Sequence, residues 1–164
     1  MSTAAVNPAL APVAQIFKIN NNMVERTLEG LSEQELWQRP AGGNPIAWLL
    51  GHVTETRGSL LTQIGAPWKP AWGKQFSRGS ACSDAGAYAT LADITTAWKE
   101  TRKLMRDAFG SLTDERLQQP PNGPSFPGVT NVADLIAFLA FHEAYHIGQM
   151  AYVRKALGHS GVAG

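Results

Sequence analysis

The sequence predicts an all-α protein, a four-helix bundle folded as a single domain over residues 1–164. Apolar residues recur every three or four positions in four long stretches, which is the period of an amphipathic helix. Capping residues precede these stretches and Gly or Pro follows them. No stretch alternates long enough to indicate a strand. Four long amphipathic helices bury their apolar stripes most simply in a bundle.

The composition is that of a folded protein with little surface charge. Hydrophobic residues make up 44% of the chain and charged residues 16%, which excludes a disordered protein. The net charge is +1 and the basic residues are scattered, so we expect no nucleic-acid partner. No apolar run reaches the roughly 18 residues of a membrane span, so we expect no membrane association. The low charge indicates a surface covered by a second subunit, and we therefore expect a homodimer.

The chain has a single cysteine, Cys82, which cannot form an internal disulfide. The N-terminal residues lack the basic region and the continuous apolar stretch of a signal peptide. Both features fit a reducing compartment, so we expect a cytoplasmic protein. No histidine neighbours Cys82 in the sequence, which predicts an inert thiol.

The first helix is predicted at about residues 8–30, with its apolar spacing interrupted by the polar run Asn20 to Asn22 and its end at Gly30. A capping-box pattern at residues 32–35 then predicts a short helical turn that stops near Pro40. Two further helices, 44–64 and 84–109, carry apolar stripes. The stripe of helix 44–64 consists of Leu49, Val53, Leu60 and Ile64. The stripe of helix 84–109 consists of Tyr88, Leu91, Ile94, Trp98 and Met105.

The second helix is predicted to begin with Asn44 as N-cap and Pro45 at its first position. A long Gly/Pro-rich loop, residues 65–86, follows it and contains three aromatic residues, Trp68, Trp72 and Phe76. Loops of this length in compact domains are typically functional. We expect a lid or a subunit contact; the alternative is that the aromatic residues cap the bundle of their own subunit.

The fourth helix is predicted at about residues 131–157, with Gly158 ending it. The segments 31–40 and 112–121 are similar to each other at a constant offset, and each precedes a Gly/Pro loop and a helix that bears histidine. This echo predicts two related helix pairs, in which His52 and His142 face each other across the bundle. Its alternative is a coincidence of capping chemistry.

Three histidines form a candidate metal site. His142 and His146 are four residues apart, so both lie on one face of a helix. They continue an apolar stripe formed by Val132, Leu135, Leu139, Met150, Val153 and Leu157. His52 follows Leu49 by three positions and is also predicted to point inward. Adjacent buried imidazoles are hard to satisfy in an apolar core, and a shared metal ion satisfies one nitrogen of each.

Three histidine ligands leave a coordination position open to water or substrate, which is typical of a catalytic metal. We expect one divalent ion, zinc in the first place, although nickel, iron and manganese also accept imidazole. The alternative is a set of core histidines bonded to backbone carbonyls or tyrosines. His159 lies beyond the last helix and is expected to be solvated.

The segment His142-Glu143-x-x-His146 also matches the zinc-protease signature. Proteases of this kind take a third ligand downstream, yet no Asp or Glu follows Glu143. The metzincin extension requires Gly and His where the chain has Gln149 and Tyr152. The sequence therefore disfavours a protease.

The stretch Phe141-His-Glu-Ala-Tyr-His-Ile-Gly-Gln149 and the stretch Trp48-Leu-Leu-Gly-His52 resemble the histidine motifs of the DinB-like (YfiT-like) metalloenzymes. The similarity covers nearly the whole chain. The resemblance implies a four-helix bundle, a metal site at His52, His142 and His146, and frequent homodimers. It also implies thiol-dependent transferases and isomerases among relatives, with bacillithiol, mycothiol or glutathione as the low-molecular-weight thiol.

Two functions are therefore expected. The first is a metal-dependent enzyme, a thiol transferase or hydrolase, in which the ion generates a thiol or water nucleophile. Its partners would be a small-molecule thiol and an electrophilic substrate, and Glu143 or Tyr145 would shuttle the proton. Glu143 lies about 100° around the helix from His142, so it could serve only to orient that ligand. The second function is a non-catalytic metal-binding or structural homodimer.

Overall fold

The computed structural model describes residues 6–77, 79–80, 88–124 and 126–162. These residues form helices and no strands, so the all-α prediction is confirmed. The long helices are α1 (Ala11–Leu28), α3 (Ile46–Gln63), α4 (Leu91–Ser111) and α6 (Val132–Ala156). The short ones are η1 (Pro8–Leu10), α2 (Glu33–Leu36), η2 (Pro40–Gly42) and α5 (Asp114–Gln118). None of the described helices is long and apolar enough to cross a lipid bilayer.

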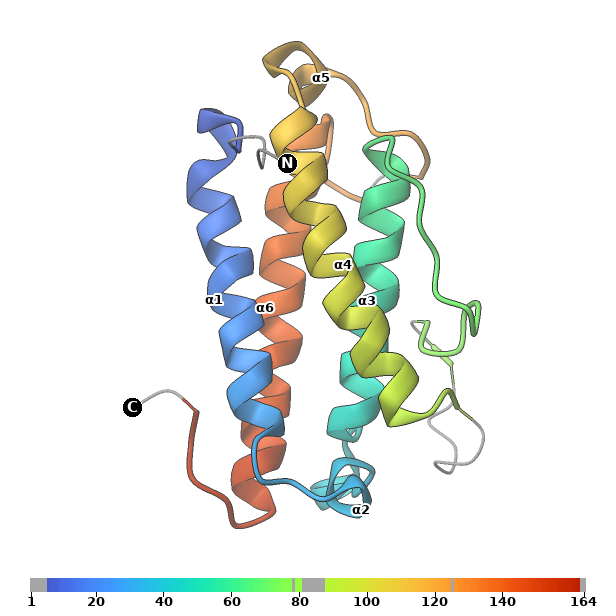
Figure 1. Cartoon of the computed structure of the whole chain (residues 1–164), viewed down its shortest axis with the longest axis vertical. Coiled ribbons are helices and arrows are strands. Elements are labelled where there is room, and N and C mark those ends of the chain that lie inside the picture. Colours follow the sequence, from blue (N-terminus) through green and yellow to red (C-terminus); the bar gives the residue numbers. More distant parts are fainter. Residues whose placement is uncertain (1–5, 78, 81–87, 125, 163–164) are drawn as a thin grey trace.

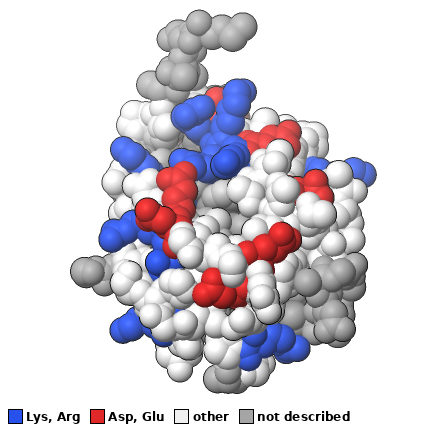
Figure 2. All heavy atoms as spheres, turned by 60° about the horizontal axis from the view of Figure 1, so that its bottom comes forward, with Lys and Arg blue, Asp and Glu red and all other residues white. Residues whose placement is uncertain are grey.

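The long helices lie side by side, with α2 at one end of the molecule and α5 at the other (Figure 1). Helix α3 packs against α4 and α6, and α1 packs against α6 and, less extensively, α4. The pair α1 and α4 is therefore opposite the pair α3 and α6. On the face seen in Figure 2, basic and acidic side chains both occur and neither sign covers it.

The hydrophobic core has two clusters of buried residues, one toward each end of the molecule. Representative members of the first are Phe17, Leu60, Met105, Phe109 and Leu135. Representative members of the second are Val24, Leu49, Ile94, Trp98 and Met150. Arg57 and Glu143, both buried, lie in sequence between the two sets on α3 and α6. A buried polar layer thus separates the two apolar clusters.

Helix α1 runs without a break through the polar run Asn20 to Asn22, as the predicted helix over residues 8–30 requires, although the run interrupts its apolar spacing. Asn20 is buried, and its amide donates a 3.4 Å hydrogen bond to the carbonyl of Ala140 on α6. The Oδ1 atom of Asn21 accepts a 2.9 Å hydrogen bond from Arg57. Asn20 and Asn21 therefore contact the buried polar layer, whereas Asn22 is exposed.

Two predicted helix starts are wrong. Helix α3 begins at Ile46 with Pro45 as N-cap, so Asn44 lies outside it and Pro45 is not the first helical residue. Helix α4 begins at Leu91 because the side chain of Thr90 caps it by accepting from the amide of Asp93. Residues 88–90 therefore precede the helix, and residues 84–87 lie outside the described residues.

Tyr88 explains why α4 starts late. Its ring stacks on Trp37 and on Phe76 instead of extending the apolar stripe of the helix. The amide of the next residue, Ala89, donates a 2.8 Å hydrogen bond to Gln75. This part of the chain is therefore held against the segment that follows α3.

The described part of the loop after α3 packs on its own chain. Phe76 is 0% exposed. The Oε1 atom of Glu55 on α3 accepts hydrogen bonds from Trp72 Nε1 and from the amides of Gln75 and Phe76, at 2.7–3.1 Å. Trp68 and Trp72 pack against the core clusters. These contacts agree with the alternative in which the aromatic residues cap their own subunit.

The similar segments 31–40 and 112–121 take equivalent places. Ser32 caps α2 and Thr113 caps α5 through side-chain hydrogen bonds to backbone amides. Helix α2 leads into α3 and α5 leads into α6, and these are the two helices that bear His52 and His142. The arrangement is the one that the repeat predicts.

Candidate metal centre

The structure brings His52 of α3 together with His142 and His146 of α6. The Nε2 atom of His142 lies 3.4 Å from that of His52 and 3.2 Å from that of His146. Each residue offers one ligand atom, and these atoms lie within 4.8 Å of one another. Tetrahedral zinc with metal–nitrogen bonds of about 2.0–2.1 Å separates its nitrogen ligands by about 3.3–3.4 Å. The two short separations therefore match those around a single ion.

Hydrogen bonds fix the tautomers of two of these histidines. His52 Nδ1 lies 2.7 Å from the carbonyl oxygen of Phe76, and His146 Nδ1 lies 2.7 Å from Gln149 Oε1. Carbonyl oxygens only accept, so each Nδ1 carries the proton and donates it. Each Nε2 then keeps its lone pair, which is the form in which imidazole binds a metal.

The electrostatics of the site favour neutral histidines. Burial lowers the pKa of His142 to about 4, and the neighbouring His146 and His52 contribute to the shift. Burial also lowers the pKa of His146, and the hydrogen bond to Gln149 opposes that shift. Both imidazoles are therefore neutral at pH 7, as metal ligands must be.

The histidines of α6 are less buried than the sequence predicts. His52 is 9% exposed, but His142 and His146 are half-buried. The centre of the buried stripe of α6 is instead formed by Glu143, Ile147 and Met150. A helical stripe about 100° wide can be centred either on His142 and His146 or on Glu143, Ile147 and Met150. The packing of α6 against both α1 and α3 buries Glu143, Ile147 and Met150.

Glu143 faces the core rather than the histidine cluster. It is 3% exposed, and Arg57 donates to both of its oxygens, from Nε at 2.6 Å and from Nη2 at 2.8 Å. The Arg57 guanidinium also lies 3.5 Å from the centre of the Trp98 ring. The sequence analysis missed Arg57, although a lone basic residue inside the apolar α3 was a signal for a buried ion pair.

Aromatic rings border the histidines. Trp48 stacks on His52 with 5.3 Å between ring centres and 9° between planes. Tyr145 is 57% exposed, and its ring lies edge-on to His146 at 5.2 Å. Of the two proton-shuttle candidates, Tyr145 is thus at the surface beside a histidine, whereas Glu143 is in the core.

Two further residues were singled out in the sequence, and the structure describes one of them, His159. His159 is not free in solvent, because its Nε2 lies 2.8 Å from Glu35 Oε1 and links the end of the chain to α2. Cys82 lies outside the described residues.

A comparison with curated proteins found no match. The profile of the DinB superfamily matches residues 16–150 of the chain. This span contains all three histidines of the cluster and most of the described helical residues. The chain belongs to the DinB superfamily.

Proposed function

We propose that this protein is a metal-dependent enzyme that holds one divalent ion at the Nε2 atoms of His52, His142 and His146. The convergence of these three atoms carries the proposal. With Nδ1 of His52 and His146 protonated, one proton on His142 Nε2 can satisfy only one of its two short contacts. A cation satisfies all three lone pairs at once. Zinc is our first choice, with nickel, iron and manganese as alternatives.

A divalent ion at this site would lower the pKa of a thiol or water that reaches it. The chain supplies three ligands, which leaves room for such a molecule. Half-burial of His142 and His146 places the centre near the surface between α3 and α6.

The neighbouring residues take different roles in this proposal. Tyr145 lies beside His146 and is exposed, so its hydroxyl is our candidate for moving the proton. Glu143 is a positioning residue, because its bidentate pair with Arg57 ties the helix turn that bears His142 to α3. Glu143 is 3% exposed and faces the core rather than the histidines, so it is not our candidate for moving the proton.

We propose a small-molecule thiol and an electrophilic substrate as reactants, in a transferase or hydrolase reaction. The support for this choice is the resemblance of the histidine motifs to those of thiol-dependent relatives. A thiol reactant also agrees with a reducing compartment such as the cytoplasm.

The alternative is a non-catalytic metal-binding protein of the same fold. One observation favours it: a cavity of about 530 Å³, large enough for a small molecule, is lined by none of the three histidines. A metal ion would then stabilise the contact between α3 and α6 without exposing a substrate site.

Metal analysis of the freshly purified protein tests the ligands. We expect one equivalent of a divalent metal in the natural protein and none in a His142→Ala, His146→Ala double variant. His159→Ala is the matched control, since it removes a histidine outside the cluster and should keep full metal content. A full equivalent of metal in the double variant would refute the site.

Thiol binding then separates the enzyme from the alternative. Low-molecular-weight thiols such as glutathione are titrated by calorimetry in buffers of different ionisation enthalpy. If the ion activates the thiol, binding releases a proton and disappears after chelation. Thiol binding that is unchanged after chelation would exclude this mechanism and leave the non-catalytic function.

A further inference from the structure

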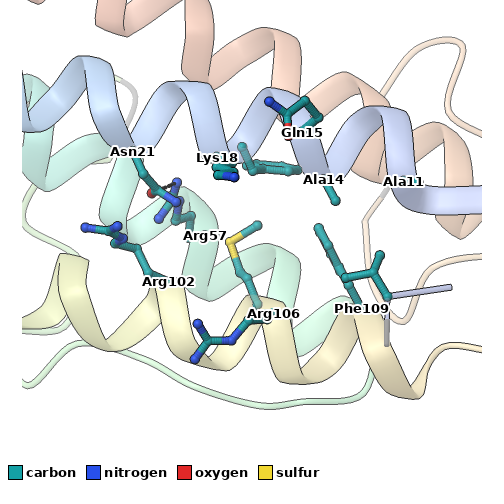
Figure 3. Close-up of a pocket in the computed structure, with 12 residues that line it drawn as sticks. Ala11, Ala14, Gln15, Lys18, Asn21, Arg57, Arg102, Arg106 and Phe109 are labelled. Carbon is teal, nitrogen blue, oxygen red and sulfur yellow. Dashed lines mark hydrogen bonds between the residues drawn. The ribbon is translucent and has the colours of Figure 1, made fainter. Parts of the chain in front are cut away.

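A cavity of about 530 Å³ lies between α1 and α4 (Figure 3), on the side of the molecule opposite α3 and α6. Its volume is within the range of pockets that bind small molecules. It lies where the contact between α1 and α4 is sparse.

The cavity has an apolar part and a cationic part. Phe17, Met105 and Phe109, all buried, supply its hydrophobic lining. In Figure 3, Ala14 and Phe109 lie toward one end of the cavity, whereas Arg57 lies toward the other.

The polar end lacks negative charge. Its lining includes four basic residues, namely Lys18, Arg57, Arg102 and Arg106, and no described acidic residue. Glu25 outside the lining pairs with Arg102, and Glu143 pairs with Arg57. Arg106 has only a long contact, 4.0 Å, with Asp107 outside the lining, so Lys18 and Arg106 are the cations that a bound anion would neutralise, together with the unpaired Nη1 donor of Arg57.

Arg57 supplies an independent sign of a missing ligand. The residue is 3% exposed, its Nε and Nη2 atoms bind Glu143 and Asn21, and it lines the cavity. Its buried Nη1 atom has no hydrogen-bond partner among the described residues. A buried guanidinium donor without an acceptor is costly, so an anionic group in the cavity would relieve a specific defect.

We propose that this cavity binds an anionic amphiphile, namely a carboxylic acid with an apolar tail. The carboxylate accepts hydrogen bonds from Arg57 Nη1 and neutralises Lys18 and Arg106, while the tail packs on Phe17, Met105 and Phe109. Guanidinium groups bind carboxylates with directed hydrogen bonds. This site is separate from the histidine centre and needs no metal.

Calorimetry with sodium decanoate below its micelle concentration tests the proposal on metal-free protein, so that the carboxylate cannot bind a metal ion instead. Decan-1-ol, which has the tail without the charge, and acetate, which has the charge without the tail, are the matched probes. We expect one saturable decanoate site. Decan-1-ol should bind at least about tenfold more weakly, which is the typical loss for a charge-assisted hydrogen bond, and acetate should not bind detectably.

Two variants locate the binding. Ala14→Phe fills the cavity from α1 and should abolish decanoate binding. A Lys18→Gln, Arg106→Gln variant should weaken it by about tenfold or more, because both residues line the cavity. An Arg26→Gln, Lys99→Gln variant removes the same charge from the same two helices outside the lining and should bind as before.

Three results would each overturn the proposal: equal affinity for decanoate and decan-1-ol, undiminished binding by Ala14→Phe, or equal losses in the two charge variants. None of these results depends on the metal centre, since the measurements use metal-free protein. Failure here would therefore leave the proposed function standing, and loss of the metal in the histidine variants would leave this site untouched.

Discussion

At the scale of single residues, each histidine of the cluster is oriented by its own neighbours. A backbone carbonyl, that of Phe76, fixes His52, and a side-chain amide, that of Gln149, fixes His146. Hydrogen bonds of this kind set the tautomer and the ring orientation of metal-binding histidines. A substitution can remove the side-chain amide of Gln149 while all three histidines stay in place, whereas no substitution removes the backbone carbonyl of Phe76.

We expect Gln149→Leu to lower the metal affinity about 10–100-fold while the metal stoichiometry stays at one. The reason is that Nδ1–H of His146 loses its acceptor and the ring loses its orientation. A competition titration with a coloured chelator measures the affinity. Gln118→Leu, an exposed position on α5, is the control. An unchanged affinity in Gln149→Leu would show that the amide does not orient the ligand.

The Arg57–Glu143 pair makes a second prediction at this scale. Arg57→Leu leaves the Glu143 carboxylate buried without a partner, so we expect a loss of about 3–5 kcal/mol in the free energy of unfolding. The Arg57→Leu, Glu143→Leu variant removes both charges and should recover much of that loss. Urea unfolding of the metal-free proteins measures both values. A double variant no more stable than the single one would mean that Arg57 acts through its ring contact with Trp98.

At the scale of elements, α3 is shaped to accept the loop that follows it. A Cβ atom at Gly51 would lie 2.6 Å from the ring of Phe76, and one at Gly58 would lie 2.9 Å from the ring of Trp68. Glycine lowers helix stability, so these positions serve close packing rather than the helix itself. The contact at Gly51 bears on the metal centre, because Phe76 also supplies the carbonyl that orients His52.

We therefore expect Gly51→Ala to lower the free energy of unfolding by about 1–3 kcal/mol, the usual cost of overpacking, and to weaken metal binding. Gly148→Ala on α6 is the matched control. Nothing lies within 4 Å of a Cβ atom there, so the substitution should be neutral or stabilising by about 0.5–1 kcal/mol. Thermal unfolding and the chelator titration measure the two effects. Equal stability of the two variants would contradict the close packing of Phe76 on α3.

At the scale of the whole molecule, the surface retains large apolar side chains after the loop has packed down. Phe141, Tyr145 and Tyr152 on α6 are 57–69% exposed, and their spacing puts them on one face of the helix. The loop aromatics no longer support an intermolecular contact, and we now expect one on this face of α6, which borders His146 through Tyr145.

A homodimer therefore stays our prediction, now with α6 at its interface. Light scattering at micromolar concentration should give the mass of two chains. Tyr152→Arg should give the mass of one, because a buried unpaired charge opposes association. The control is Lys99→Glu, which changes the charge on the exposed side of α4 and should leave the dimer intact. Tyr88→Arg is not suitable as a control, because the Tyr88 ring is packed inside the molecule. A monomeric natural protein would refute the prediction.

The sequence alone was sufficient to predict the long helices, apart from the starts of α3 and α4, and the histidine cluster. Apolar periodicity and caps are local signals: the capping box at Ser32 is where the sequence places it, and α6 begins at Val132, one residue after the predicted start. The spacing of His142 and His146 fixes their common face, because it depends on helix geometry alone. Their meeting with His52 followed from the inward placement of both helices.

The tertiary structure decided what depends on packing between distant segments. Whether Glu143 or His142 lies at the centre of the buried stripe depends on which helices flank α6, and the bidentate bond from Arg57 makes Glu143 the buried residue. Arg57 of the same pair also donates to Asn21 in the polar run of α1, a contact between residues 36 positions apart. The cavity between α1 and α4 likewise arises from the packing of whole helices. Such features depend on contacts between residues that are dozens of positions apart in the sequence. The local apolar period carries no information about those contacts.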